Sequence, residues 1–390
     1  RWKAKPVTGL PALASGLVGY LGWDTVRQIE KLPHAPASDI DVPEVALTFA
    51  RDLVVLDHKW GTVLLVTNVL EGRSDWDDAQ RRLDEIQSAM ATPASPGLAT
   101  LDLSAQMTPS LRTNKSDFLE SVVKSKNHIV AGDVFQVVVS QRFDVPNNAD
   151  PIVVFRVLRS LYPSPYMYLL CHTGLLGEPL HVVGSSPEAL VKVQSGRVYT
   201  KPIAGSRPRG ESPEQDIALG EDLLNDHKER AEHLMLVDLA RNDLLRVCRA
   251  GSVEVTEFMK VERFSHIMHI VSSVEGDLAS GKDAVDVFRA TFPAGTLSGA
   301  PKPRALEIID ALEPAARGVY GGVVGYFAFS GDADLAIAIR TAVLTPGLAS
   351  VQAGAGLVAD SDPETEYQET INKSAAPLRA IANALSQLGS

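Results

Sequence analysis

Two pairs of glutamates, far apart in the chain, are the residues most able to do chemistry together. Glu229 and Glu232 lie in DHKERAEHLMLVDLARND, and Glu366 and Glu369 lie in ETEYQETINK. Residues three apart on a helix share one face, so each segment offers two carboxylates to one point in space. If the two faces meet, the converging charge needs protons or a cation, and Mg²⁺ suits a site of carboxylates, waters and an anionic substrate. Taken alone, the spacing more often means two solvated helix faces, because glutamate is mostly exposed.

Three other segments offer groups that an anionic substrate requires. PIAGSRPRG (202–210) combines backbone N–H groups beside Gly205, the hydroxyl of Ser206 and two arginines, although an ordinary surface loop has the same composition. Arg340 interrupts the apolar run LAIAIRTAVL, where a buried arginine needs an anion, either from the protein or from a substrate carboxylate. QAGAGLV (352–358) lacks the glycine order of a dinucleotide site, so it indicates tight sheet packing or a close backbone approach.

Two titratable side chains are candidates for proton transfer. His269 in HIMHIVSS can move a proton near neutral pH, or it can be a core histidine with satisfied hydrogen bonds. Glu188 in SSPEAL follows a predicted strand at a turn, where its carboxyl group could face a cleft. The simpler interpretation of Glu188 is a glutamate at a helix N-terminus. Lys302 and Lys373, taken alone, are mostly solvated charges.

Composition limits the class of protein. The chain has 390 residues, 45% of them hydrophobic, and a net charge of −11, which is enough for a large core and two or three domains. It has no basic block for nucleic acid and no apolar run of the ~18 residues that suggest a membrane span. Cys171 and Cys248 are too few for a disulfide framework, so we expect the cytoplasm. The chain begins at Arg1 without Met, so we expect that an N-terminal stretch is missing.

Periodicity predicts the elements that position these residues. Strands are expected in 15–24 and as a hairpin from 45–58 and 61–70, a helix in 75–90, and a connector in 91–110. A helix over 116–133 has Ser116 as its N-cap, and a strand follows at 135–145. Further along, a strand in RVYT runs into the loop PIAGSRPRG, and the acidic segment is a helix. GVYGGVVGYFAFSG, LAIAIRTAVLT and ASVQAGAGLVA predict three strands before a final helix.

Runs of strands with interspersed helices favour an α+β fold with large antiparallel sheets. We expect an N-terminal domain over 1–110 and a second, catalytic domain over 111–390.

Taken in order, these strings closely resemble the chorismate-utilising enzymes, and in particular the family of anthranilate synthase component I. The resemblance is densest over 115–385 and is carried by PIAGSRPRG, the acidic helix, HIMHIVSSVEGDL, FPAGTLSGAPKPRALEIID, RGVYGGVVGYFAFSG, IAIRTAV and QAGAGLVADSDPETEYQETINK. It implies a sandwich of large antiparallel sheets with helices outside. It also implies a lyase that aminates chorismate and eliminates pyruvate to give anthranilate, the first committed step of tryptophan biosynthesis.

Two positions separate the branches of this family. Relatives that add water to the ring carry a lysine base where this chain has Gln136, and an amide cannot deprotonate water. Aminodeoxychorismate synthases commonly carry a lysine nucleophile where this chain has Ala204. Both residues favour anthranilate synthase, in which ammonia attacks the ring. Aminodeoxychorismate synthase, aminodeoxyisochorismate synthase and a non-catalytic homologue that senses chorismate or tryptophan stay open as alternatives.

The resemblance also implies a role for each candidate residue. Mg²⁺ would bind the ring carboxylate of chorismate, with Glu232 and Glu369 as the first choice of ligands and Glu229 and Glu366 in support. Arg340 and Tyr320, with the backbone near Gly354 and Gly356, would bind the enolpyruvyl carboxylate, and Gly205 and Ser206 would line the ring.

The resemblance also implies three groups that act on protons or charge. Glu188 would be the general acid, and His269 would act in the elimination step. Lys373 would orient a metal-bound water or neutralise excess carboxylate.

Partners and regulation follow from the same resemblance. No cysteine sits in the setting of a glutaminase nucleophile, so ammonia would come from a separate glutamine amidotransferase subunit in a hetero-oligomer. Pro165, Tyr166 and Met167 in PSPYMYLL resemble half of a feedback site for tryptophan. The other half, a Leu-Leu-Glu-Ser segment near the N-terminus of the family, does not occur here. Ser206 stands where the family usually has threonine, and the hydroxyl is retained.

Overall fold

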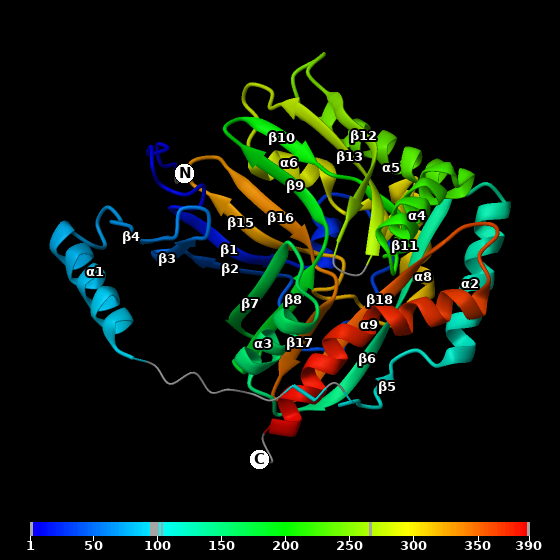
Figure 1. Cartoon of the computed structure of the whole chain (residues 1–390), viewed down its shortest axis with the longest axis horizontal. Coiled ribbons are helices and arrows are strands. Elements are labelled where there is room, and N and C mark those ends of the chain that lie inside the picture. The colour runs from blue at the N-terminus through cyan, green and yellow to red at the C-terminus, as the bar shows by residue number, and fades with distance from the viewer. Residues whose placement is uncertain (1–2, 94–100, 103, 265–266, 388–390) are drawn as a thin grey trace.

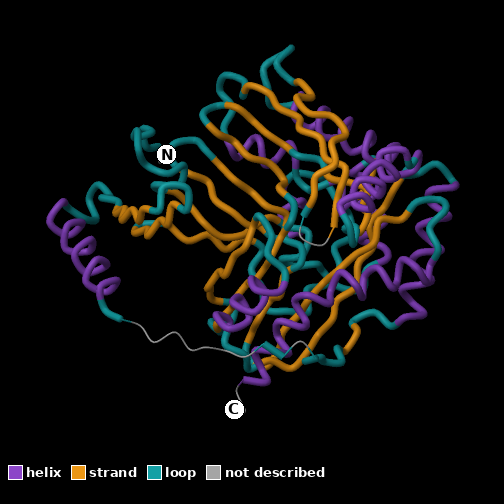
Figure 2. Tube along the Cα trace, in the orientation of Figure 1, coloured by secondary structure: helices purple, strands orange, loops and turns teal. Residues whose placement is uncertain are grey.

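Two large antiparallel sheets pack face to face in the computed structural model, which describes residues 3–93, 101–102, 104–264 and 267–387 (Figures 1 and 2). The main core joins the two sheets, since it includes Val191 and Leu335 of one and Val137 and Ala355 of the other. Helices cover the outside of this sandwich. The α+β sandwich expected from the sequence is therefore confirmed.

The larger sheet joins strands from both ends of the chain. Its spatial order is β11 (Ile203–Pro208), β13 (Ile267–Asp277), β10 (Arg197–Thr200), β9 (Ala189–Gln194), β16 (Ala333–Ile337), β15 (Val323–Ala328), β1 (Gly16–Leu21) and β2 (Val45–Phe49), with β12 (Glu254–Arg263) beside β13. Strand β1 pairs with β15 along its whole length. The first 50 residues thus complete a sheet whose other strands come after residue 188, while the division into two domains at residue 110 stays a prediction.

The second sheet carries the long central strands β6 and β18. Its order is β14 (Gly299–Ala300), β6 (Gln136–Asn147), β18 (Gly347–Leu357), β17 (Thr341–Thr345), β8 (Pro179–Ser186) and β7 (Tyr166–Thr173), with β5 (Ser110–Leu111) beside β6. Almost every residue of β6 is buried, which explains its continuous apolar character. A separate hairpin, β3 (Asp52–Asp57) and β4 (Thr62–Thr67), packs with α1 at one side of the molecule (Figure 1).

The helices lie on the outer surfaces and at one end of the sandwich. They are η1 (Trp23–Gln28), α1 (Trp76–Ala91), α2 (Lys115–Val130), α3 (Pro151–Leu161), α4 (Pro213–Asn225), α5 (His227–Leu245), α6 (Ala284–Thr291), α7 (Gly295–Ser298), α8 (Lys302–Leu312) and α9 (Pro363–Ser386). Helices α3 and α9 bury Leu158 and Ile381 against the outer face of the second sheet. Among the described helices, none combines the length and apolar character that crossing a membrane requires.

Three sequence expectations about local structure were wrong. The N-cap of α2 is Asn114, whose side chain accepts a hydrogen bond from the backbone of Asp117, and not Ser116. The loop expected at PIAGSRPRG contains strand β11, whose pairing with β13 shifts at Gly205. The single strand expected in LAIAIRTAVLT is two strands, β16 and β17, which belong to different sheets. Apolar pattern alone did not reveal that break, because both strands are buried. Most of the expected connector at 91–110 lies outside the described residues.

Candidate active site

Helix α5 holds the first carboxylate pair near the end of β11. The Asp226 side chain caps the helix by accepting from the backbone N–H groups of Lys228 and Glu229. Burial, followed by the charge of Glu232, raises the pKa of Glu229. A Cβ atom at Gly205 would lie 2.9 Å from Glu229 Oε2. The glycine, with its φ of 72°, therefore lets the strand approach this carboxylate closely.

Helix α9 holds the second pair beside β18. Burial raises the pKa of Glu366, and the neighbouring Glu369 raises it further. The Oε2 atom of Glu366 is buried and has no hydrogen-bond partner among the described residues. Lys373 forms an ion pair with Glu369 and donates to the carbonyl oxygen of Gly354 at 3.1 Å. Lys373 is thus a paired cation beside the carboxylates, and not the solvated charge that its sequence context alone indicated.

Both carboxylate pairs border the same end of β6 and β18. Gln136 Nε2 donates to Glu232 Oε1 at 3.3 Å, and the same nitrogen would lie 2.8 Å from a Cβ atom at Gly356. On the other side, Glu369 acts electrostatically on Arg340. Within the described ranges, however, no three His, Cys, Asp or Glu side chains are grouped closely enough to hold a metal ion. The carboxylates therefore stand as two pairs and not as one cluster.

Arg340 is a half-buried cation to which the described residues offer no side-chain partner. It occupies the break between β16 and β17 with a φ of 51°, in the left-handed region that few non-glycine residues adopt. Burial lowers its pKa, while Tyr320, Glu369 and Glu188 partly offset that effect. Among the described residues, its guanidinium has no hydrogen bond or ion pair. An unpaired buried cation is costly, so this position suits an anionic ligand.

Tyr320 and the glycines of β18 form a wall near Arg340. Burial raises the pKa of Tyr320 to about 12, which keeps the phenol neutral and able to donate a hydrogen bond. A Cβ atom at Gly354 would lie 2.9 Å from both the Tyr320 hydroxyl and the carbonyl oxygen of Val139. The small residues of QAGAGLV therefore serve both tight sheet packing and a close approach to a side chain of the site.

Glu188 has the properties of a general acid. Thr296 Oγ1 donates to its Oε1 atom at 2.9 Å. Burial raises the pKa of Glu188 to about 7, although Thr296, Lys373 and Arg340 each lower it. A carboxyl group with such a pKa is substantially protonated at neutral pH and can give its proton to a leaving group. Glu188 lies in the turn between β8 and β9 and does not begin a helix, so the simpler interpretation of the sequence was wrong.

His269 lies on β13 opposite Ser206 of β11. Its Nδ1 atom lies 2.9 Å from the carbonyl oxygen of Gly205. Because a carbonyl oxygen can only accept, Nδ1 carries the hydrogen, and Nε2 is left free to take a proton. Burial lowers the pKa of His269, and the charge of Arg340 lowers it further, so the ring is neutral at pH 7. Ser206 itself is exposed.

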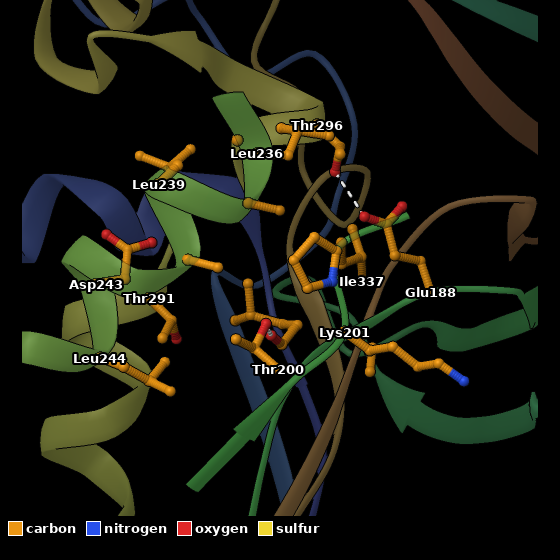
Figure 3. A pocket seen from close by; sticks show the side chains of 16 residues that line it. Glu188, Thr200, Lys201, Leu236, Leu239, Asp243, Leu244, Thr291, Thr296 and Ile337 are labelled. Atoms are coloured by element: carbon orange, nitrogen blue, oxygen red, sulfur yellow. Dashed lines mark hydrogen bonds between the residues drawn. The ribbon is translucent and has the colours of Figure 1, made fainter. Parts of the chain in front are cut away.

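A pocket opens on one side of Glu188 (Figure 3). It is lined by α5, by the β9–β10 region and by the segment from α6 to α7, and its labelled polar residues include Glu188, Thr296, Thr200 and Asp243. Asp243 forms a nearly buried ion pair with Lys302, whose ammonium also donates to the carbonyl oxygen of Thr291. Thr296 was not predicted as a site residue, because an uncharged hydroxyl in FPAGTLSGAPKPRA has no distinctive spacing. Lys302 in the same segment was wrongly expected to be solvated.

The residues expected at a tryptophan site lie at the start of β7, where successive side chains point to opposite faces of the second sheet. Tyr166, at the start of β7, donates to Asp334 Oδ1 of β16 at 3.0 Å, and Met167 packs on the outer core. Pro165 precedes them directly. Tyr166 and Met167 pair with Ser186 and Ser185 of β8, the strand that leads to Glu188.

The fold and the site together define a class of enzyme. The model of the chorismate binding enzyme family matches residues 2–379. The chain belongs to this family.

Within this family, the chain is similar to proteins named anthranilate synthase component 1. The chain is 54% identical to anthranilate synthase component 1 of Arthrobacter globiformis over 388 residues, which cover 96% of this chain and 73% of that protein. It is 50% identical to the protein of the same name from Mycolicibacterium smegmatis, with 98% and 74% covered. Among solved structures, anthranilate synthase component I from Streptococcus pneumoniae superposes with a TM-score of 0.88 at 39% identity, covering 97% of this chain and 83% of that one.

Proposed function

We propose that this chain is the synthase component of an anthranilate synthase, which converts chorismate and ammonia to anthranilate, pyruvate and water. The observation that carries the proposal is the half-buried guanidinium of Arg340, which has no ion-pair partner among the described residues and lies within electrostatic range of Glu188 and Glu369. An acid with a pKa of about 7 beside an anion site suits a carboxylated substrate that loses a hydroxyl group. The named relatives supply the identity of that substrate.

Each step assigns a proton to a residue of the site. In the amination, the ammonia nitrogen forms a bond to ring carbon C2 while the C4–oxygen bond breaks, and Glu188 protonates the departing hydroxyl to give water. In the elimination, the C2 proton leaves and the bond from C3 to the enolpyruvyl oxygen breaks, which makes the ring aromatic and releases pyruvate. His269, neutral with a free Nε2 atom, is our choice to accept the C2 proton. Arg340 and Tyr320 hold the enolpyruvyl carboxylate, and Ser206 borders the ring.

Gln136 and Ala204 support amination over the related reactions. Gln136 donates its amide hydrogen to Glu232 and cannot act as a base toward water. Ala204 is buried in β11 and offers no nucleophile to the ring. Free ammonia is therefore the attacking group that fits this site. A partner subunit that hydrolyses glutamine is the proposed source, in a hetero-oligomer whose activity tryptophan inhibits. The cytoplasm stays the predicted compartment.

Mg²⁺ is proposed as the cofactor, with Glu232 and Glu369 as ligands and Glu229 and Glu366 in support. The donor chemistry suits such an ion, because the pKa values of Glu229 and Glu366 are both raised and Glu366 Oε2 is buried with no donor among the described residues, although no three of the described carboxylates are grouped closely enough to hold it. When bound, the ion would neutralise these charges and orient the ring carboxylate.

Anthranilate fluorescence tests this function directly. The protein is incubated with chorismate and Mg²⁺, and ammonium or glutamine is supplied as the nitrogen source. We expect fluorescence with ammonium at high pH and none with glutamine, until a glutamine amidotransferase subunit is added. Consumption of chorismate without fluorescence would instead indicate an amino intermediate that keeps its enolpyruvyl group, and would contradict the proposal.

A further inference from the structure

Arg317 is a buried arginine near the site, and each of its three guanidinium nitrogens donates at least one hydrogen bond. It follows α8 and is 2% exposed. Its Nε and Nη2 atoms donate to the two oxygens of Glu313 at 2.8 and 2.7 Å. Nη1 donates to the carbonyl oxygen of Leu297, and Nη2 also donates to that of Val138, both at 2.8 Å. The planar fork of the guanidinium therefore joins three separate segments, which the single ammonium group of a lysine could not do.

Glu313 extends this network into β6. Its Oε1 atom accepts from the backbone N–H and the hydroxyl of Ser140, both at 2.8 Å. Together with the bond from Arg317 to Val138, the pair fixes β6 at two positions that are two residues apart. The same strand begins with Gln136, which bonds to Glu232. The Glu313–Arg317 pair thus fixes the position of β6 relative to α5, the helix that carries Glu232.

The other bonds of Arg317 lead to the groups that handle the substrate. Leu297, whose carbonyl accepts from Arg317, directly follows Thr296, whose hydroxyl donates to Glu188. The guanidinium also lies 5.6 Å from the ring centre of Tyr320 and 4.2 Å from that of Trp23 in η1. Arg317 therefore lies where the segment that carries Thr296 meets the segment that carries Tyr320.

Stability alone does not account for such a pair. Taking two charges out of water is costly, and apolar side chains of similar volume often replace a buried ion pair without loss of stability. What an apolar pair cannot do is hold the carbonyl of Leu297 and the backbone of β6 at fixed distances. We propose that Arg317 is a positioning residue, which keeps Thr296 and Glu188 in register with Tyr320 across the substrate. This inference rests on the proposed role of Glu188.

Arg317→Lys is the first test, because it keeps the charge and loses the fork. We expect kcat to fall about 100-fold, as a misplacement near 1 Å can cause, while the KM for chorismate changes less than about threefold. Thr296 lowers the pKa of Glu188, so a looser Thr296 bond should move the fall of kcat to higher pH. Arg82→Lys is the matched control. Arg82 is also buried and bonds to Asp52, Thr67 and the carbonyl of Asn68, but it lies in α1, far from the site (Figure 1).

A second variant covers the case in which Arg317→Lys does not fold. Glu313→Leu combined with Arg317→Met fills the space with apolar groups and should fold, as near-native circular dichroism would show, yet have a low kcat. Wild-type kcat and an unshifted pH profile in either variant would overturn the inference. Failure of the underlying function is distinguishable, because it would appear as wild-type kcat in Glu188→Gln, and the positioning role would fall with it.

Discussion

At the scale of single residues, this site places ionisable side chains in partly buried positions where their charges are not fully compensated. Burial raises the pKa of Glu188 to about 7, and Arg340 is a cation that forms no ion pair within the described part of the chain. Each is unfavourable in the free protein and useful when a carboxylated substrate arrives. Residue-level substitutions should therefore change binding or chemistry while leaving the fold intact.

Glu188→Gln should remove the general acid and its pH dependence. In the wild type, kcat should fall as pH rises through about 7, because the raised pKa of Glu188 is the midpoint at which it loses its proton. The glutamine variant should lose about 10²- to 10⁴-fold in kcat, with no remaining transition near pH 7. The measurement is anthranilate fluorescence from pH 5.5 to 9, roughly the range that brackets that midpoint, with free ammonia held constant. Glu178→Gln, on the exposed turn between β7 and β8, is the control. A wild-type profile in Glu188→Gln would exclude this assignment.

Arg340→Met should separate binding from folding. Loss of a charged hydrogen-bond partner costs about 1.5–3 kcal/mol, so the KM for chorismate should rise on the order of 10- to 100-fold. Because the half-buried guanidinium has no ion-pair partner among the described residues, its removal should cost little stability, and the variant should unfold at an equal or higher temperature than the wild type. Steady-state kinetics and a thermal melt measure the two effects. A large drop in melting temperature with unchanged KM would mean that Arg340 has a structural role.

At the scale of elements, glycines let strands approach neighbouring elements closely, and these contacts position the side chains of the site. Strand β18 presents Gly354 and Gly356 toward Tyr320 and Gln136, and strand β11 presents Gly205 toward Glu229. These contacts join elements that are separated by many residues in the chain. Small side chains at these points are therefore part of the site, although they carry no chemistry of their own.

Gly356→Ala and Gly354→Ala should have different effects. At 356 the added methyl would meet the end of the Gln136 side chain at 2.8 Å, which can move at the expense of its bond to Glu232. At 354 it would also meet the backbone oxygen of Val139 at 2.9 Å, which cannot move easily. We expect Gly356→Ala to lose activity with little loss of stability. Gly354→Ala should also lower the free energy of unfolding, by about 1–3 kcal/mol. Chemical denaturation and kinetics of both variants decide, and equal loss of stability would contradict this account.

Sequence patterns predicted the elements better than their junctions. The long apolar strand β6, the helix α1 expected in 75–90 and the acidic helix α5 each have a local signal, and all three occur as expected. The break at Arg340 has no such signal, because both flanking strands are equally apolar. Thr296 and Arg317 were missed for a related reason. Their importance comes from partners such as Glu188 and Val138, more than 100 residues away, and single-chain spacing contains no information on those distances.

At the scale of the whole molecule, one carboxylate pair comes from the middle of the chain and the other from its last helix, and both border the same end of β6 and β18. Raised pKa values of Glu229 and Glu366 mean that their contribution to stability is fully present below the ordinary value of 4.5 and is lost as pH rises through the folded value. Without a cation, the free energy of unfolding should therefore decrease as pH rises above 4.5.

Mg²⁺ should reverse that loss. At neutral pH, saturation with Mg²⁺ at about 100 times its Kd should stabilise the protein by about 2.7 kcal/mol, measured as an upward shift of the melting temperature. Glu369→Gln should abolish most of the shift with little effect on the melt in its absence. Glu364→Gln is the matched control, since Glu364 lies in the same helix but is exposed and pairs with Lys115. An undiminished shift in Glu369→Gln would remove Glu369 from the proposed metal site.

The break between β16 and β17 has a mechanical consequence. The chain leaves one sheet and enters the other at Arg340, so an anion gripped there is fastened to both halves of the sandwich at once. Occupancy by chorismate should then slow amide hydrogen exchange in both sheets together, including Ile337 on one side and Ala342 on the other. A ligand held by a surface loop would slow amide exchange only in the residues around that loop, whereas a ligand held at Arg340 should slow it in both sheets.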